Sequence, residues 1–139
     1  MKLCADGMDA EGAGDETQAI NLFTKAWNEA STDFEKFTAA HFVARHQKTI
    51  NEKLVWDETA LHHALKINDE SMKGSLPSLF LNIGKCHEDL NHFELARNFY
   101  QKAHCYIDYL SDDGYGKMIK SGIAAGIERM NQQPYAFTK

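Results

Sequence analysis

The chain has 139 residues, a length that suits one domain of ordinary size. Hydrophobic residues make up 43% of it and charged residues 25%, proportions that are typical of globular chains and argue against disorder. The formal net charge of −5 disfavours a general nucleic-acid-binding surface, although it leaves room for a local basic patch.

Three further features narrow the class of protein. Only two prolines occur, Pro77 and Pro134, which favours long helices over many short strands. The three cysteines form no CxxC pair, so we expect neither a disulfide framework nor a cysteine zinc site, and the chain fits a reducing cytoplasm. No stretch approaches the roughly 20 apolar residues that a membrane-spanning helix needs.

The first residues differ in composition from the rest of the chain. Residues 1–14 are acidic and glycine-rich, and they lack the apolar run of a signal peptide. We therefore expect a flexible N-terminal lead-in over 1–14, a single helical domain over 15–133 and a C-terminal tail over 134–139.

Four helix starts are predicted from capping residues, whose short side chains accept hydrogen bonds from free backbone N–H groups of the first turn. The predicted caps are Asp15, Thr32 with Glu35, Thr49 with Glu52, and Asn91 with Glu94. They predict helices that begin near residues 16, 33, 50 and 92.

Periodicity adds two helices. Leu79, Ile83 and His87 recur at helical spacing and predict a helix over 77–90, with Pro77 in its first turn, where a missing N–H costs little. A last helix over 115–132 carries Met118, Gly122 and Ala125 on one face. No alternating apolar and polar run is bounded by hairpin turns, so we predict an all-α fold of about six helices without a sheet.

A repeated pattern runs through three of these helices: a small residue, three others, a large residue, two others and a small residue. It is carried by Ala19, Phe23 and Ala26, by Asp57, Leu61 and Ala64, and by Ala96, Tyr100 and Ala103, with Asp57 the exception in size. The large residue recurs after 38 and then 39 positions. A fixed period in this range is typical of a solenoid of helix pairs.

One segment carries more of this pattern than the others. Its residues are Phe80, Ile83, Gly84 and His87 on one helix and Phe93, Ala96, Tyr100 and Ala103 on the next. This segment resembles the tetratricopeptide repeat, whose helices follow W-x2-L-G-x2-Y and A-x3-F-x2-A. The resemblance covers 77–104 best and 16–29 in part, whereas in 33–67 His41 stands at the glycine position and the spacing is longer.

The resemblance implies an antiparallel helix-pair solenoid that binds a peptide or a protein surface in a concave groove lined by the first helix of each pair. The groove-facing residues implied are Thr38, Phe42, Arg45, Ser78, Leu81, Asn82, Lys85, Glu88 and Asp89, with Lys117 and Lys120 extending the surface. Arg45, Lys85 and Lys120 favour an acidic segment as the partner. The structural alternative is a set of solvated helix faces with ordinary charge pairs.

A second interpretation assigns chemistry to histidines. His41 and Arg45 are four residues apart and share a helix face, so with His87 they form an alternative pocket for a small molecule or for general base catalysis. The structural alternative for His41 is packing at a helix interface. No histidine spacing is typical of a metal site, and no glycine-rich phosphate loop occurs, so we expect no metal and no cofactor.

The leading hypothesis from the sequence is therefore a non-catalytic protein–protein interaction module in the cytoplasm, without nucleic-acid or membrane partners. A third possibility is a purely structural homodimer, because a short solenoid has two uncovered ends that a second copy can cover.

Overall fold

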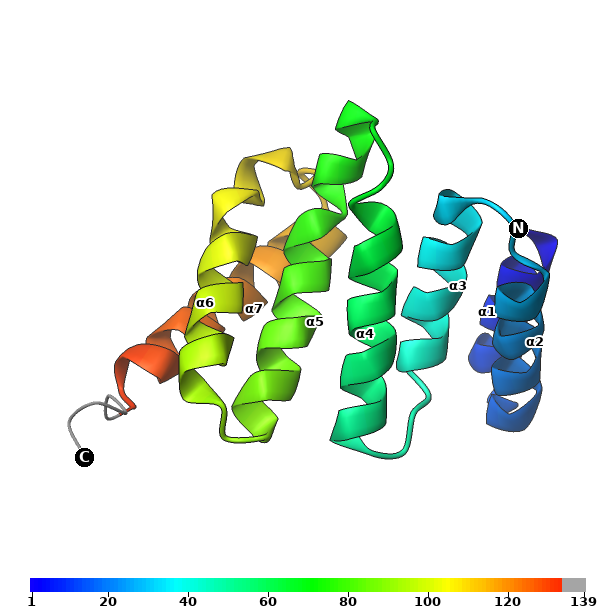
Figure 1. Cartoon of the computed structure of the whole chain (residues 1–139), viewed down its shortest axis with the longest axis horizontal. Coiled ribbons are helices and arrows are strands. Elements are labelled where there is room, and N and C mark those ends of the chain that lie inside the picture. The colour runs from blue at the N-terminus through cyan, green and yellow to red at the C-terminus, as the bar shows by residue number, and fades with distance from the viewer. Residues whose placement is uncertain (134–139) are drawn as a thin grey trace. The chain divides into compact units, whose positions relative to one another are not determined.

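The computed structural model describes residues 1–133, which form seven α-helices and two short 3₁₀-helices and contain no strand (Figure 1). The predicted all-α class is confirmed for these residues. The chain divides into two compact units, Met1–Ile67 and the residues from Asn68 onward, where the sequence had suggested one domain. The tail expected over 134–139 lies outside the described residues.

The helices of each unit follow one another through short connections. The first unit contains α1 (Lys2–Gly12), α2 (Glu16–Glu29), α3 (Asp33–Ala44) and α4 (Ile50–Ala64). The second unit contains the 3₁₀-helix η1 (Glu70–Gly74), α5 (Leu76–Asp89), α6 (Phe93–Cys105), the 3₁₀-helix η2 (Ile107–Tyr109) and α7 (Gly114–Asn131).

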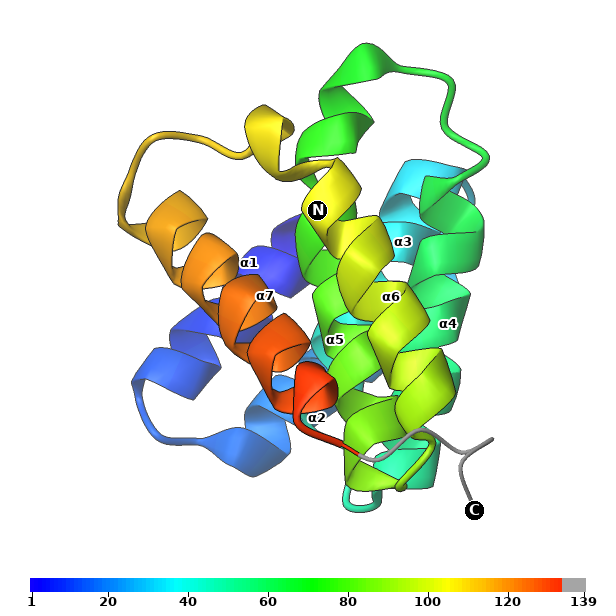
Figure 2. The same cartoon turned by 90° about the vertical axis from the view of Figure 1, so that its left-hand side faces the viewer.

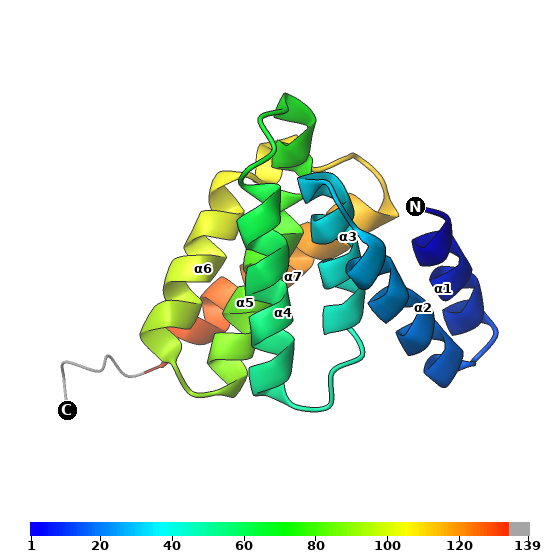
Figure 3. The same cartoon turned by 45° about the vertical axis from the view of Figure 1, so that its right-hand side comes forward.

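The helix α1 replaces the flexible lead-in that composition suggested. It runs antiparallel to α2 (Figure 3), and the two are joined by Gly14 in the left-handed conformation, with φ of 80°. The N–H of Gly14 donates to the carbonyl of Glu11 and that of Asp15 to the carbonyl of Ala10, so the last carbonyls of α1 are satisfied. Asp15 then caps α2 by accepting from the N–H of Gln18, as predicted.

Close packing in the first unit depends on a glycine. A Cβ atom at Gly7 of α1 would lie 2.5 Å from Cε1 of Phe23 in α2, so the ring occupies the space that a side chain would need. Phe23 is fully buried and forms a core with four other buried residues, which are Cys4, Ala19, Ala39 and Val43.

The hairpin of α3 and α4 begins with the predicted caps. Thr32 and Glu35 form a reciprocal capping box, and Thr49 accepts from the N–H of Glu52. At the other end of α4, His63 Nδ1 lies 2.8 Å from a carboxylate oxygen of Asp33 at the start of α3. This bond ties the two antiparallel helices together.

The hairpin of α5 and α6 corrects one predicted cap. Pro77 lies in the first turn of α5, as predicted, but Asn91 does not cap α6. It adopts the left-handed conformation, with φ of 64°, directly after α5. The N–H of Asn91 donates to the carbonyl of Glu88 and that of His92 to the carbonyl of His87, so this turn ends α5 as Gly14 ends α1.

The two glycine-dependent hairpins are equivalent along the chain. Gly7, Gly14, Ala19, Phe23 and Ala26 correspond to Gly84, Asn91, Ala96, Tyr100 and Ala103, and each pair is 77 positions apart. The close approach recurs with them, because a Cβ atom at Gly84 would lie 3.0 Å from the ring of Tyr100. Helix α2 therefore pairs with α1 as α6 pairs with α5.

Helix α7 packs against α5 and α6 (Figure 2) and completes the second unit. Its buried residues include Ile119, Ile123, Gly126 and Met130. The predicted helix is therefore present, but the residues Met118 and Ala125 lie on its exposed side.

Candidate functional site

The predicted groove residues of α5 meet α7 in the second unit. A Cβ atom at Gly122 of α7 would lie 3.1 Å from Cδ2 of Leu81, so this half-buried leucine lies directly against α7. Lys85 follows Leu81 by one helical turn, and Tyr115, Met118 and Ala125 share a face with Gly122. We call this surface the α5–α7 face and define it by Leu81, Lys85, Tyr115, Met118, Gly122 and Ala125.

The α5–α7 face combines exposed apolar side chains with charges. Met118 is 62% exposed and Tyr115 49% exposed, and both are large apolar residues. Lys85 is exposed and forms an ion pair of 2.8 Å with Asp89 on the same helix. The face therefore combines exposed apolar side chains that precede Gly122 on α7 with a cation one helical turn beyond Leu81 on α5, held only by a solvent-exposed ion pair.

The remaining predicted residues of this unit are placed differently. Ser78 is buried and donates to the carbonyl of Ser75, and Asn82 is half-buried on α5. Lys120 is exposed, but it is two residues from both Met118 and Gly122 and so projects from another side of α7. Lys120 therefore does not belong to the α5–α7 face.

Glu88 ties the hairpin to α7 instead of lining an open groove. It accepts hydrogen bonds from the hydroxyl of Tyr100 at 2.6 Å and from Nε of Arg129 at 2.7 Å, with a second guanidinium nitrogen at 3.0 Å. The Arg129 hydrogen bond is the main reason that the pKa of Glu88 is lowered. Burial and this carboxylate raise the pKa of Tyr100, so the hydroxyl remains a donor.

The predicted groove residues of α3 lie in the first unit and mainly make internal contacts. The hydroxyl of Thr38 donates to the carbonyl of Phe34 at 2.8 Å. The ring of Phe42 stacks on that of Phe23, with centroids 4.8 Å apart. Phe42 is therefore a packing residue next to the core, not a free anchor for a peptide.

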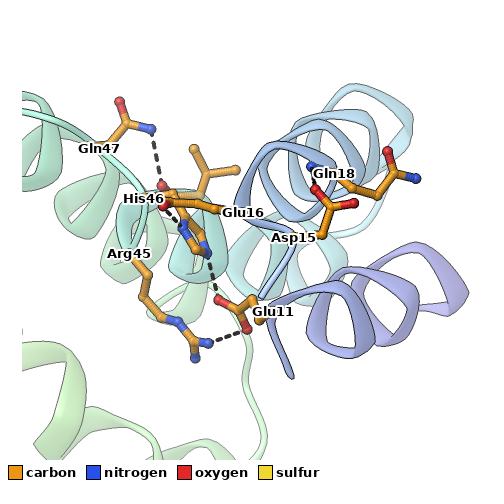
Figure 4. Close-up of polar contacts among 8 residues, drawn as sticks. Glu11, Asp15, Glu16, Gln18, Arg45, His46 and Gln47 are labelled. Atoms are coloured by element: carbon orange, nitrogen blue, oxygen red, sulfur yellow. Dashed lines mark hydrogen bonds and ion pairs between the residues drawn. The ribbon is translucent and has the colours of Figure 1, made fainter. Parts of the chain in front are cut away.

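Arg45 lies at the end of α3 in a charged cluster (Figure 4). One guanidinium nitrogen donates to Glu11 Oε1 at 2.5 Å, and the group lies 4.9 Å from the centre of the Phe42 ring. His46 Nε2 lies 2.6 Å from the other oxygen of Glu11, and its Nδ1 lies 3.5 Å from Glu16. Burial opposes ionisation of Glu11, but the bonds to Arg45 and His46 outweigh it and lower its pKa.

A pocket of about 430 Å³ adjoins this charged cluster and is lined by Glu11, Gly14, Glu16, Arg45 and His46. The sequence pointed to Arg45 but missed Glu11, Glu16 and His46. One signal was available, because Glu11 precedes Glu88 by the same 77 positions that relate the two hairpins.

The alternative pocket of His41, Arg45 and His87 draws on both units. His41 packs edge-on against Phe42 in the first unit, and burial lowers its pKa, so the ring is neutral near pH 7. His87 belongs to the second unit, where it is buried, stacks on Phe99 and has Nδ1 3.3 Å from that of His92. Both histidines therefore make ring contacts within their own units.

Within residues 1–133, no three histidine, cysteine or acidic side chains are placed to hold a metal ion. Within the same residues, no helix has both the length and the apolar character that crossing a membrane requires. The three cysteines are all free, and Cys4 and Cys86 are buried.

No family model matches the chain, and no curated protein and no solved structure shows a significant match to it.

Proposed function

We propose that the chain is a non-catalytic protein–protein interaction module, built from tetratricopeptide-like helix pairs, that binds its partner on the α5–α7 face. The observation that carries this proposal is the exposure of Met118 and Tyr115 beside the half-buried Leu81. Large apolar side chains gathered on one exposed face are typical of binding surfaces, because their burial against a partner is favourable.

The chemistry of the face describes the partner. An amphipathic segment would place apolar side chains against Met118 and Leu81 and acidic side chains near Lys85, which is exposed. Arg45 is left out of this partner site, because it belongs to the first unit, whereas α5 and α7 belong to the second.

The same hairpin, made twice from glycine and a large aromatic residue, supports a repeat scaffold of this kind. We assign the module to the cytoplasm, since three free cysteines fit a reducing compartment.

Affinity capture from native lysate, read by mass spectrometry, tests the proposal. The baits are the wild type, Met118→Glu on the α5–α7 face and Leu95→Glu as a control, because Leu95 is an exposed apolar residue of α6 in the same unit. We expect one protein to be captured by the wild type and by Leu95→Glu but not by Met118→Glu. Circular dichroism should show that the Met118→Glu bait is folded. Equal capture by all three baits would contradict the proposal.

Light scattering of the purified chain distinguishes a homodimer from a complex with a different protein. A dimer that Met118→Glu converts to a monomer, and that Leu95→Glu leaves intact, would mean that a second copy of the chain covers the face. A monomer in all three cases leaves a different protein as the partner.

A further inference from the structure

The charged cluster of the first unit has unused binding capacity that the interaction surface does not explain. Its pocket of about 430 Å³ lies where α1 ends, α2 begins and α3 ends (Figure 4). The pocket is an open depression, since the side chains of Arg45 and Glu16 on its wall are 45% and 71% exposed. Its walls carry both signs of charge, from Arg45 and from two glutamates.

Arg45 and Arg129 make equivalent ties that differ in one respect. In the second unit Arg129 uses two nitrogens of its guanidinium group on Glu88. In the first unit Arg45 uses one nitrogen on Glu11, and Nε2 of His46 lies against the other carboxylate oxygen. Among residues 1–133, Arg45 makes no other hydrogen bond, so part of its guanidinium edge has donors to spare.

The free edge of Arg45 is held in a fixed position. Glu11 binds the guanidinium group from one side, and the ring of Phe42 lies 4.9 Å from it on another. A planar guanidinium group binds a carboxylate through parallel N–H bonds. Because the side chain is already ordered, such binding loses less conformational entropy than it would at a free surface arginine.

Glu16 supplies the opposite charge. Its side chain is 71% exposed, and one carboxylate oxygen lies 3.5 Å from Nδ1 of His46. This distance is too long for a strong hydrogen bond. The carboxylate of Glu16 therefore keeps its capacity to accept from a cation, and the His46 ring separates it from the Arg45–Glu11 pair.

We propose that this pocket binds a small zwitterion of the amino-acid class, with the ligand's carboxylate on the free edge of Arg45 and its ammonium group on Glu16. A ligand with a single charge would pair with either Arg45 or Glu16 and leave the other of these two side chains without a partner on the ligand. Both charges on one small framework satisfy both groups.

Nuclear magnetic resonance titration of the purified chain tests the proposal, with L-lysine, acetate and ethylammonium as probes. We expect L-lysine to shift the amide signals of Gly14, Glu16 and His46 and to reach saturation. The two single-charge probes should bind at least about tenfold more weakly, because each forms only one of the two ion pairs.

Matched variants separate recognition from folding. Glu16→Gln and Arg45→Gln should each weaken L-lysine binding at least about tenfold, whereas Glu58→Gln, an exposed change on α4, should leave it unaltered. Affinities that stay unchanged in both pocket variants would overturn the proposal. So would equal binding of acetate or ethylammonium, or L-lysine shifts confined to residues outside the pocket. Met118→Glu should not affect this titration, so failure here is distinct from failure of the proposed interaction surface.

Discussion

The packing of α1 on α2 requires the absence of a side chain at Gly7, and the substitution Gly7→Ala tests this requirement. The new Cβ atom would lie 2.5 Å from Cε1 of Phe23 and 2.8 Å from Cδ1. Favourable carbon contacts lie at about 3.5–4.0 Å, so the overlap is about 1 Å. The ring has little freedom to retreat, because it is fully buried and stacked on Phe42.

The expected loss follows from two opposing effects. Overpacking of this kind costs about 1–3 kcal/mol. Replacing glycine by alanine inside a helix returns about 1 kcal/mol through helix propensity. We therefore expect Gly7→Ala to lower the free energy of unfolding of the first unit by up to about 2 kcal/mol.

Tryptophan fluorescence during urea unfolding measures this change in the first unit alone. The chain has two tryptophans, Trp27 and Trp56, and both pack against the core that contains Phe23. The matched control is Gly12→Ala in the same helix, where a Cβ atom meets nothing within 4 Å. Gly12→Ala should raise the free energy of unfolding by up to about 1 kcal/mol.

A double-mutant cycle completes the test, because Gly7→Ala should cost less in a Phe23→Leu background, where the ring is gone. If Gly7→Ala proves as stable as Gly12→Ala, the close contact of α1 with the Phe23 ring does not exist and the reasoning is refuted.

Three further outcomes are expected. Tyr100→Phe should speed amide hydrogen exchange in α6 by removing the 2.6 Å bond to Glu88, a loss of about 1 kcal/mol; unchanged exchange would contradict this. The pKa of Glu88 is lowered from 4.5 in the folded state, so its pairing with Arg129 contributes fully to the free energy of unfolding above pH 4.5. This contribution is lost as the pH falls through the lower pKa of the folded state. The melting temperature of Glu88→Gln should therefore drop less on acidification than that of the wild type. Thr32→Ala should cost about 1 kcal/mol in urea unfolding, whereas Thr17→Ala, exposed on α2, should cost less.

Helix starts were predictable where one side chain decides them. Asp15, Thr32 and Thr49 each accept a hydrogen bond from the N–H three residues on, which depends only on local geometry. The prediction that Asn91 caps α6 was wrong because asparagine also tolerates the left-handed conformation. That second role was decided by where α5 ends, and the expected partner Glu94 bonds to Arg97 instead.

Helix α1 was missed because its composition suggests a loop. Gly7 and Gly12 lower helix propensity, and Met1 at its start provides no capping side chain. What holds α1 is the contact of Gly7 with Phe23, a residue 16 positions away. The same spacing separates Gly84 from Tyr100, so comparing the two hairpins at an offset of 77 would have found it.

The candidate site shows the limit of periodicity. Spacing on α5 correctly placed Leu81 and Lys85 on a common face, but it carries no information on what covers that face. The contact of Leu81 with Gly122 and the bond of Glu88 to Arg129 are both made by α7, which is distant in sequence. Likewise, Arg45 was identified by type, while its partner Glu11 lay in a segment that was not expected to fold.

The difference between the two charged ties follows from one pair of equivalent residues. Tyr100 carries a hydroxyl that donates to Glu88, whereas Phe23 at the equivalent position has none to offer Glu11. His46 supplies the missing donor: its ring stacks on Phe23, with centroids 5.7 Å apart, and its Nε2 lies 2.6 Å from Glu11. The imidazole lies against one oxygen of Glu11, and Arg45 donates to the other through one nitrogen, so this arginine makes a single bond and keeps a free edge. The same hairpin therefore makes a closed structural tie in the second unit and leaves an open charged pocket in the first.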